Sequence, residues 1–148
     1  MDLNSIQEMW KKDSVIDEVM LDQASLKIPQ LHHKYLTLRS EYTLLSKRKA
    51  QELKKLQHSK WLYYSGKAAP EEYEAQPFPH KVIKSDVIHW VQVDKDIMNA
   101  EMKLEYYDTV LGVLNEILKQ VHQMSYNIKS CIQWRTFVGG VWAFLNSG

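Results

Sequence analysis

The chain has 148 residues, of which 45% are hydrophobic and 25% are charged, a composition that suits one folded domain with its own core. With 5 glycines and 4 prolines it lacks the turn residues of an all-β protein, and its many Leu, Lys, Glu, Gln and Met residues favour helices. The formal net charge is +1, but residues 34–67 carry nine Lys or Arg and two Glu, a local +7. Residues 1–33 and 86–119 have local charges of −3 and −4. The basic block is either a solvated helix face or an anion-binding surface.

The cysteine content and the chain ends indicate an intracellular protein. Cys131 is the single cysteine, so an internal disulfide is impossible and a reducing compartment is favoured. Residues 1–4 lack the basic and apolar regions of a secretory signal peptide. The apolar stretch at 141–145 is far shorter than the roughly 20 residues of a membrane span. We therefore expect no membrane anchor.

Two short helices are predicted at the N-terminus. Ser5 and Glu8 fit a capping box, which predicts a first helix over about 5–12. A new cap at Asp13 or Ser14 predicts a second helix that reaches about residue 24.

A long basic helix is predicted next. Pro29 suits the first turn of a helix, and apolar residues recur at helical spacing over 31–62. Gly66 suits the residue that follows a helix C-terminus, so the helix should end near Tyr64. Residues 67–85 contain three of the four prolines and are predicted to form a loop.

The C-terminal part shows the most regular pattern. After a possible N-cap at Asp86 or Asp94, apolar residues alternate at spacings of three and four from Ile97 to Ile132, interrupted only by Ser125. A second apolar stripe runs beside this seam, which makes the face wider than a two-stranded coiled coil needs. We therefore predict a ring-like homo-oligomer of four or more subunits, with the helix ended by the glycine pair 139–140. The predicted oligomerisation residues are Leu104, Tyr107, Leu111, Leu114, Leu118, Val121, Ile128 and Ile132.

Motifs for catalysis, cofactors and metals are missing from the sequence. The glycine at position 66 lacks the upstream glycine of a phosphate-binding loop, and no two of the six histidines have a metal-ligand spacing with a matching partner. Asp94 and Asp96 are interpreted as charges favoured by a helix N-terminus and not as paired catalytic acids. The sequence therefore predicts a protein that is not an enzyme and needs no cofactor or metal.

The segment 54–67 interleaves positive charges with aromatic rings. Cations neutralise phosphates and release counterions, while flat rings stack on unpaired bases, a combination that suits single-stranded nucleic acid. The alternative is that the rings simply pack the helix end. The candidate DNA-binding residues are Lys54, Lys55, His58, Lys60, Trp61, Tyr63, Tyr64 and Lys67.

This segment resembles a motif of the UvsY family, the recombination mediator proteins of T-even-type phages. The family motif has Lys, any residue, Arg, two further residues, Tyr-Tyr-Ser-Gly and a basic residue, and residues 58–67 read His-Ser-Lys-Trp-Leu-Tyr-Tyr-Ser-Gly-Lys. The similarity spans about residues 3–137. Further matching residues are Lys11, Lys12, Asp13, Ile16, Asp17, Asp94, Lys95, Asp96, Ile128, Lys129, Ile132 and Arg135.

The resemblance implies a protein that binds single-stranded DNA, oligomerises through its C-terminal part and acts in the cytoplasm of an infected bacterium. Its partners would be a RecA-like phage recombinase, which it helps to load, and the phage single-strand-binding protein that covers the DNA. Two departures affect the motif, because His58 and Lys60 replace a lysine and an arginine of the family. The tail 138–148 is also longer than the family leads us to expect.

We therefore predict a mainly α protein with three regions. Residues 1–93, including the loop 67–85, would bind DNA, residues 94–137 would form a coiled-coil-like oligomerisation helix, and residues 138–148 would be a tail of open role. The alternative is a structural coiled-coil scaffold or assembly adaptor without a nucleic-acid role. A scaffold fits the apolar seam equally well but gives no reason for a +7 block beside three large aromatic residues.

Overall fold

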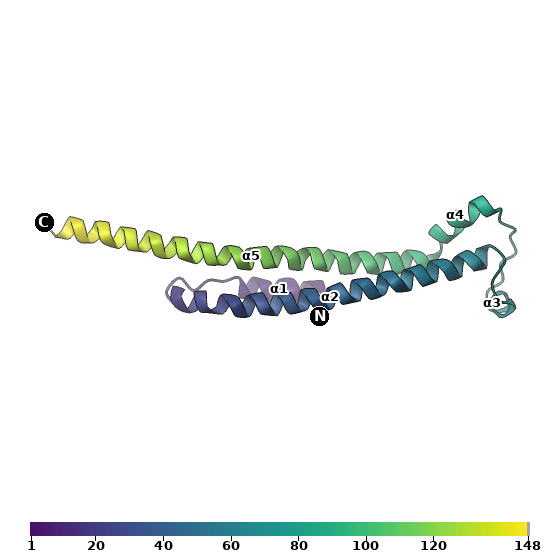
Figure 1. Cartoon of the computed structure of the whole chain (residues 1–148), viewed down its shortest axis with the longest axis horizontal. Helices are drawn as coiled ribbons and strands as arrows, with labels where there is room; N and C mark the ends of the chain where they lie inside the picture. The colour runs from purple at the N-terminus through teal and green to yellow at the C-terminus, as the bar shows by residue number, and fades with distance from the viewer. Residues whose placement is uncertain (148) are drawn as a thin grey trace. The chain divides into compact units, whose positions relative to one another are not determined.

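The computed structural model describes residues 1–147 and is mainly helical (Figure 1). In chain order the elements are α1 (Leu3–Asp13), α2 (Leu21–Tyr64), α3 (Pro70–Ala75), the 3-10 turn η1 (Lys84–Asp86), α4 (Val87–Gln92) and α5 (Lys95–Asn146). The predicted mainly α fold, with a long basic helix and a long C-terminal helix, is confirmed. No helix within the described residues has the length and apolarity needed to cross a membrane.

The chain forms two compact units, and α2 and α5 contribute to both. The terminal unit contains Met1–Glu41 and the C-terminal segment that begins at Val110, and the central unit contains Tyr42–Thr109. Each unit therefore has to be built from segments that are distant in sequence.

In the terminal unit, α1 packs against the first half of α2. The Trp10 ring meets the Tyr35 ring edge-on at 5.4 Å between centroids, and Ile6 and Tyr35 are fully buried. The Asp13 carboxylate accepts hydrogen bonds from Lys34 at 2.6 Å and from the Tyr35 hydroxyl at 2.9 Å. This polar contact closes the C-terminal end of α1 onto α2.

The predicted capping box at the N-terminus is wrong. Asp2 is the N-cap of α1, since its carboxylate accepts a hydrogen bond from the Ser5 backbone N–H at 2.8 Å. The helix begins at Leu3, and Ser5 lies inside its first turn. An aspartate is as good a cap as a serine, and its charge also favours the helix N-terminus.

The predicted second helix, from residue 13 or 14 to about 24, is also wrong. Residues 14–20 are irregular, and the Asp17 carboxylate accepts a hydrogen bond from the Val19 N–H at 3.0 Å, an alternative to helical bonding. α2 begins at Leu21, so Pro29 lies inside a helix and not in its first turn. A proline in a helix interior costs about 3 kcal/mol relative to alanine. We infer that the buried Leu21 side chain helps to hold the extra turns in place.

In the terminal unit α5 presents a buried seam. Its members are spaced alternately by four and three residues, and they come from both of the predicted apolar stripes: Val110, Leu114, Ile117, Val121, Met124 and Ile128. Because these side chains are buried within one chain, part of the wide apolar face is used for folding and not for assembly.

The prediction that α5 ends at the glycine pair 139–140 is wrong. The helix continues to Asn146. Each helical glycine costs only about 1 kcal/mol relative to alanine, which is less than the cost of a helix-breaking proline. The tail 138–148 is therefore helical up to residue 146.

In the central unit the second half of α2 runs antiparallel to the start of α5. Ser46 donates to Asp108 at 2.7 Å, and Lys60, further along α2, donates to Asp96, earlier in α5, at 2.9 Å. The buried core of this unit combines α2, α4 and α5, and its members are Leu53, Val87, Val91, Ile97 and Ala100.

The end of α2 follows the prediction. Gly66 has a φ of 77°, its N–H donates to the Tyr63 carbonyl, and the Lys67 N–H donates to the Leu62 carbonyl at 2.9 Å. These two bonds form a Schellman motif, which requires a residue in the left-handed region. The predicted loop 67–85 is wrong in one respect, because Pro70 starts the short helix α3. Proline is favoured at the first helical position.

Candidate nucleic-acid interface

The predicted DNA-binding segment lies on two different sides of α2. An α-helix turns about 100° per residue, so residues 54, 58 and 61 share one side, whereas residues 53, 60 and 64 share another. Leu53 is part of the buried core, so Lys60 and Tyr64 are directed toward the interior of the central unit. The motif is therefore divided into an inner and an outer side.

The inner side is a polar corner, the Asp94 corner, formed by Lys60, Tyr64, Asp94 and Asp96. The Lys60 ammonium lies 2.9 Å from Asp96 and 3.4 Å from Asp94, with 15% of the side chain exposed. The Tyr64 hydroxyl donates to Asp94 at 2.6 Å. The other oxygen of Asp94 accepts from the backbone N–H groups of Asp96 and Ile97 at 2.9 and 3.2 Å, so Asp94, one of the two predicted cap positions, caps α5.

The ionisation of the Asp94 corner is shifted to favour the charged pair. Burial alone would raise the pKa of Asp94, but hydrogen bonds from Tyr64 and the Ile97 backbone, together with Lys60, hold it below its ordinary value. Burial alone would lower the pKa of Lys60, but Asp96 and Asp94 raise it. Burial and the Asp94 carboxylate raise the pKa of the Tyr64 hydroxyl. Lys60 is therefore a charged, internally neutralised residue.

Tyr63 and Tyr64 belong to an aromatic cluster that includes rings from α3, the following loop and α4. Tyr63 stacks on Tyr73 at 5.3 Å, and Tyr64 meets Phe78 edge-on at 5.1 Å. Trp90 lies 5.8 Å from Tyr64. The Tyr63 hydroxyl donates to the Gln76 carbonyl at 2.8 Å, and the Tyr73 hydroxyl donates to the Tyr63 carbonyl at 2.7 Å.

Sequence reasoning missed the outer members of this cluster. These are Tyr73, Phe78 and Trp90. Aromatic residues in a loop rich in proline were the sequence signal that could have predicted this packing. The rings of Tyr63 and Tyr64 thus hold the loop against the end of α2.

The outer side of α2 carries exposed cations. Lys54, Lys55 and His58 are exposed, and none of them takes part in an ion pair within residues 1–147. The Lys67 ammonium lies over the half-buried Trp61 ring, 5.0 Å from its centroid, a cation–π distance.

The outer cations belong to a longer row that sequence reasoning missed. Exposed Lys47 and Gln51 precede Lys54 and His58 at spacings of four, three and four residues, which places all four on one side of α2. We name this row the basic track. The sequence contains this 4-3-4 spacing, but the many other basic residues of 34–67 make the row hard to recognise without the structure.

The basic track leads to a small cavity, which we name the track-end pocket. The cavity has a volume of about 210 Å³. Its lining combines one aromatic ring, two valines, a hydroxyl and two lysines: Trp61, Ser65, Lys67, Val82, Lys84 and Val87. Lys84 was not among the residues predicted from the sequence.

The predicted oligomerisation residues are in three different environments. Leu114, Val121 and Ile128 are buried within the chain, and Ile132 is exposed. The remaining four are half-buried: Leu104, Tyr107, Leu111 and Leu118. Within the central unit the Tyr107 ring also contacts Tyr42 at 6.1 Å. The half-buried and exposed members are the ones with surface left for another subunit.

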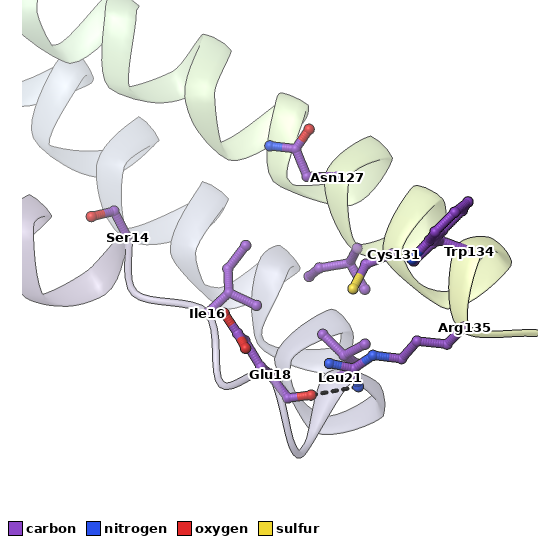
Figure 2. Close-up of a pocket in the computed structure, with 9 residues that line it drawn as sticks. Ser14, Ile16, Glu18, Leu21, Asn127, Cys131, Trp134 and Arg135 are labelled. Atoms are coloured by element: carbon purple, nitrogen blue, oxygen red, sulfur yellow. Dashed lines mark hydrogen bonds between the residues drawn. The ribbon is translucent and has the colours of Figure 1, made fainter. Parts of the chain in front are cut away.

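A larger groove lies in the terminal unit (Figure 2). Its volume is about 580 Å³, and its lining includes Cys131 and Trp134 of α5 and Ile16 and Glu18 of the irregular segment. The Arg135 guanidinium donates to the Glu18 carbonyl at 2.6 Å. This bond fixes the irregular segment against α5.

Comparison with known proteins decides the family. A family model described as "Recombination, repair and ssDNA binding protein UvsY" matches residues 9–141. The chain belongs to the UvsY family. The chain is 25% identical over 140 residues to the recombination protein UvsY of Enterobacteria phage T4, an alignment that covers 95% of this chain and 99% of that protein.

Solved structures of that phage protein have the same fold. One crystal structure of the bacteriophage T4 recombination mediator protein UvsY, lattice type II, has a TM-score of 0.84 and 24% identity, covering 94% of this chain and 98% of that chain. A second, lattice type IV, has a TM-score of 0.81 and 23% identity, covering 93% and 98%. The resemblance inferred from residues 58–67 is therefore confirmed, and the chain is a member of a family of recombination, repair and single-stranded-DNA-binding proteins.

Proposed function

We propose that this protein is a recombination mediator that binds single-stranded DNA along the outer side of α2. The observation that carries the proposal is the exposed outer side of α2, where Lys54 and Lys55 have no ion pair within residues 1–147, in a chain whose residues 9–141 match a family of single-stranded-DNA-binding proteins. In this role it promotes the loading of a RecA-like recombinase onto DNA covered by single-strand-binding protein. The site of action is the cytoplasm of a phage-infected bacterium.

Within this proposal the predicted DNA-binding residues have two kinds of role. Lys54, Lys55 and Lys67 neutralise phosphates and release counterions, and Trp61 supplies a stacking surface. His58 adds charge only when it is protonated. The other predicted residues are positioning residues, because Lys60, Tyr63 and Tyr64 are engaged in contacts within the central unit.

Assembly would multiply these contacts. The apolar surface that α5 leaves uncovered, including Ile132, Trp134 and Phe137, supports a homo-oligomer of four or more subunits. Linked copies of a weak site bind one strand with an avidity far above that of a single site. A strand held along several copies would be loosened from single-strand-binding protein and presented to the recombinase.

Fluorescence anisotropy with a labelled single-stranded oligonucleotide at several salt concentrations tests the DNA-binding step. The double variant Lys54→Ala/Lys55→Ala should bind more weakly, and its log–log salt slope should be shallower by roughly 0.7 for each lost phosphate contact. Lys119→Ala/Lys129→Ala, two exposed lysines of α5 outside the predicted DNA-binding segment, is the control matched in charge and should change the slope less. A wild-type protein that does not bind single strands would support the scaffold alternative and overturn the proposal.

Sedimentation velocity tests the assembly step. Ile132→Asp changes an exposed side chain and should reduce the oligomer mass while the helical circular dichroism signal is kept. Leu114→Asp places a charge at a fully buried position and should unfold the terminal unit instead. An Ile132→Asp variant with unchanged mass would exclude this position from the interface.

The mediator step is measured as the rate of recombinase filament formation on covered DNA, which should rise when the protein is added.

A further inference from the structure

The track-end pocket has an apolar floor that belongs to the core of the central unit. Val87 is 2% exposed, and the half-buried Trp61 and Val82 pack against the same core cluster. The volume of about 210 Å³ lies below the roughly 300 Å³ at which sites for drug-sized ligands begin. A cavity of this size suits one flat ring system and not a whole cofactor.

The rim of the pocket is cationic. Lys67 lies over the Trp61 ring, and exposed Lys84 projects from η1 at another part of the lining. Among residues 1–147 no acidic residue lines the cavity, although Asp86 occupies the same 3-10 turn as Lys84. An apolar floor with two cations at its rim is complementary to a nucleotide, whose flat base is attached to a charged phosphate.

The position of the pocket connects it with the basic track. Trp61 and Ser65 continue the spacing of Lys54 and His58 by three and four residues, so the same side of α2 passes from the track into the cavity. With a rise of 1.5 Å per residue, Lys47 lies roughly 20 Å from Trp61 along the helix axis. A strand whose phosphates follow the track is thereby led to the pocket.

We propose that the track-end pocket takes up one unstacked nucleobase of the bound single strand. The base stacks on the Trp61 ring, Lys67 moves from that ring to a neighbouring phosphate, and Lys84 contacts a phosphate on another side of the pocket. This inference rests on the proposed function and adds to it a base site and a further DNA-binding residue, Lys84.

Two single-stranded probes of equal length test the proposal, one of thymidines and one of abasic residues with the same phosphates. The wild-type protein should prefer the thymidine strand by roughly tenfold, because stacking on an aromatic side chain is lost with the base. Trp61→Leu should abolish this preference and leave the salt slope unchanged. Val82→Phe, which fills the cavity and keeps Trp61, should also abolish it, so a folding defect of one variant does not decide the result.

A matched pair of lysine variants tests Lys84. Lys84→Ala should weaken binding to both probes and reduce the salt slope by roughly 0.7, whereas exposed Lys81, which does not line the cavity, should matter less when changed to alanine. Oligomer mass is measured for each variant, because lost avidity would also weaken binding.

The outcomes separate the two proposals. Equal binding of both probes by the wild-type protein, or equal effects of Lys84→Ala and Lys81→Ala, would overturn the base pocket and leave DNA binding along the track intact. No binding of either probe by the wild-type protein would overturn both.

Discussion

The inner and outer sides of the last three turns of α2 place similar residues in opposite physical situations. On the inner side, Lys60 has two carboxylates within 3.4 Å and a side chain that is 15% exposed. On the outer side, Lys54 and Lys55 face solvent without an ion-pair partner in the described chain. The comparison teaches that only part of the local charge of +7 is available to a ligand, because Lys60 pairs with acidic residues at the start of α5.

The same division applies to the rings. Trp61 lines a cavity beside two lysines, whereas the hydroxyl groups of Tyr63 and Tyr64 donate hydrogen bonds to acceptors within the central unit. Within the Tyr-Tyr-Ser-Gly segment, Gly66 therefore ends the helix, Tyr63 holds the loop, and Tyr64 donates a hydrogen bond to Asp94. Under the proposed function, these internal contacts hold the outer side in place for the strand.

Asp94→Ala should have the largest effect on the inner side. It removes the N-cap of α5, the acceptor of Tyr64 and one partner of Lys60, for an expected loss of about 2–4 kcal/mol in the free energy of unfolding. Urea denaturation followed by circular dichroism measures this loss. Asp86→Ala is the control, because Asp86 precedes α4 without a side-chain capping bond. Equal midpoints for the two variants would show that the Asp94 corner is not important for stability.

Acid should weaken the same corner by a smaller amount. The pKa of Asp94 is lowered in the folded state from the ordinary value of 3.8. Near this pH the folded state therefore binds fewer protons than the unfolded state. The stabilisation is complete above that value and is lost as the pH falls through the lower folded-state pKa. Urea denaturation from pH 6 down to pH 2 should show this decline, and Asp94→Asn should make the curve flatter. An unchanged decline in that variant would assign it to other carboxylates.

Lys60→Ala and Lys54→Ala form a pair that contrasts the two sides directly. Each removes one lysine from α2, so the net charge changes equally. Lys60→Ala should lower the free energy of unfolding by about 1 kcal/mol and leave the salt slope of DNA binding nearly unchanged. Lys54→Ala should leave the stability unchanged and reduce that slope by roughly 0.7. The reverse pattern would mean that Lys60 leaves the Asp94 corner to bind phosphate.

The sequence allowed the fold class and the end of α2 near Tyr64 to be predicted, and it narrowed the cap to Asp86 or Asp94, because each depends on local chemistry. It did not allow the sides of α2 to be separated, since this depends on which residues of α5 lie opposite. The pairing of Lys60 with Asp96 joins positions 36 residues apart. The segment 14–20 was mistaken for a helix because its apolar residues have helical spacing, whereas Asp17 bonds locally to Val19.

The wide apolar face of α5 shows a similar limit. The two predicted stripes were both real, but Leu114, Val121 and Ile128 from one stripe and Val110, Ile117 and Met124 from the other are buried together within the chain. A hydrophobic pattern shows that a face will be covered and does not show whether the cover comes from the same chain or from another subunit.

Asp96→Asn should have the smallest effect and gives the sharpest test of the comparison. Asp96 is exposed, with 61% of its side chain accessible, and holds Lys60 at 2.9 Å, while Asp94 remains as a second partner at 3.4 Å. Exposed ion pairs contribute only about 0–1 kcal/mol, so the stability should change little. The loss of one negative charge beside α2 should strengthen single-strand binding, most clearly at low salt, where screening is weakest.

The salt dependence then tells how Asp96 acts. If Lys60 stays with Asp94, the variant should bind more tightly only through the weaker repulsion of phosphates, and the log–log slope should stay close to that of the wild-type protein. If release from Asp96 frees Lys60 for the strand, the slope should become steeper by roughly 0.7, one additional phosphate contact. The double variant Asp96→Asn/Lys60→Ala distinguishes these cases, since it should keep the gain in the first case and lose it in the second. An unchanged salt slope in Asp96→Asn would mean that Lys60 stays on the inner side and that only the outer side contacts the strand.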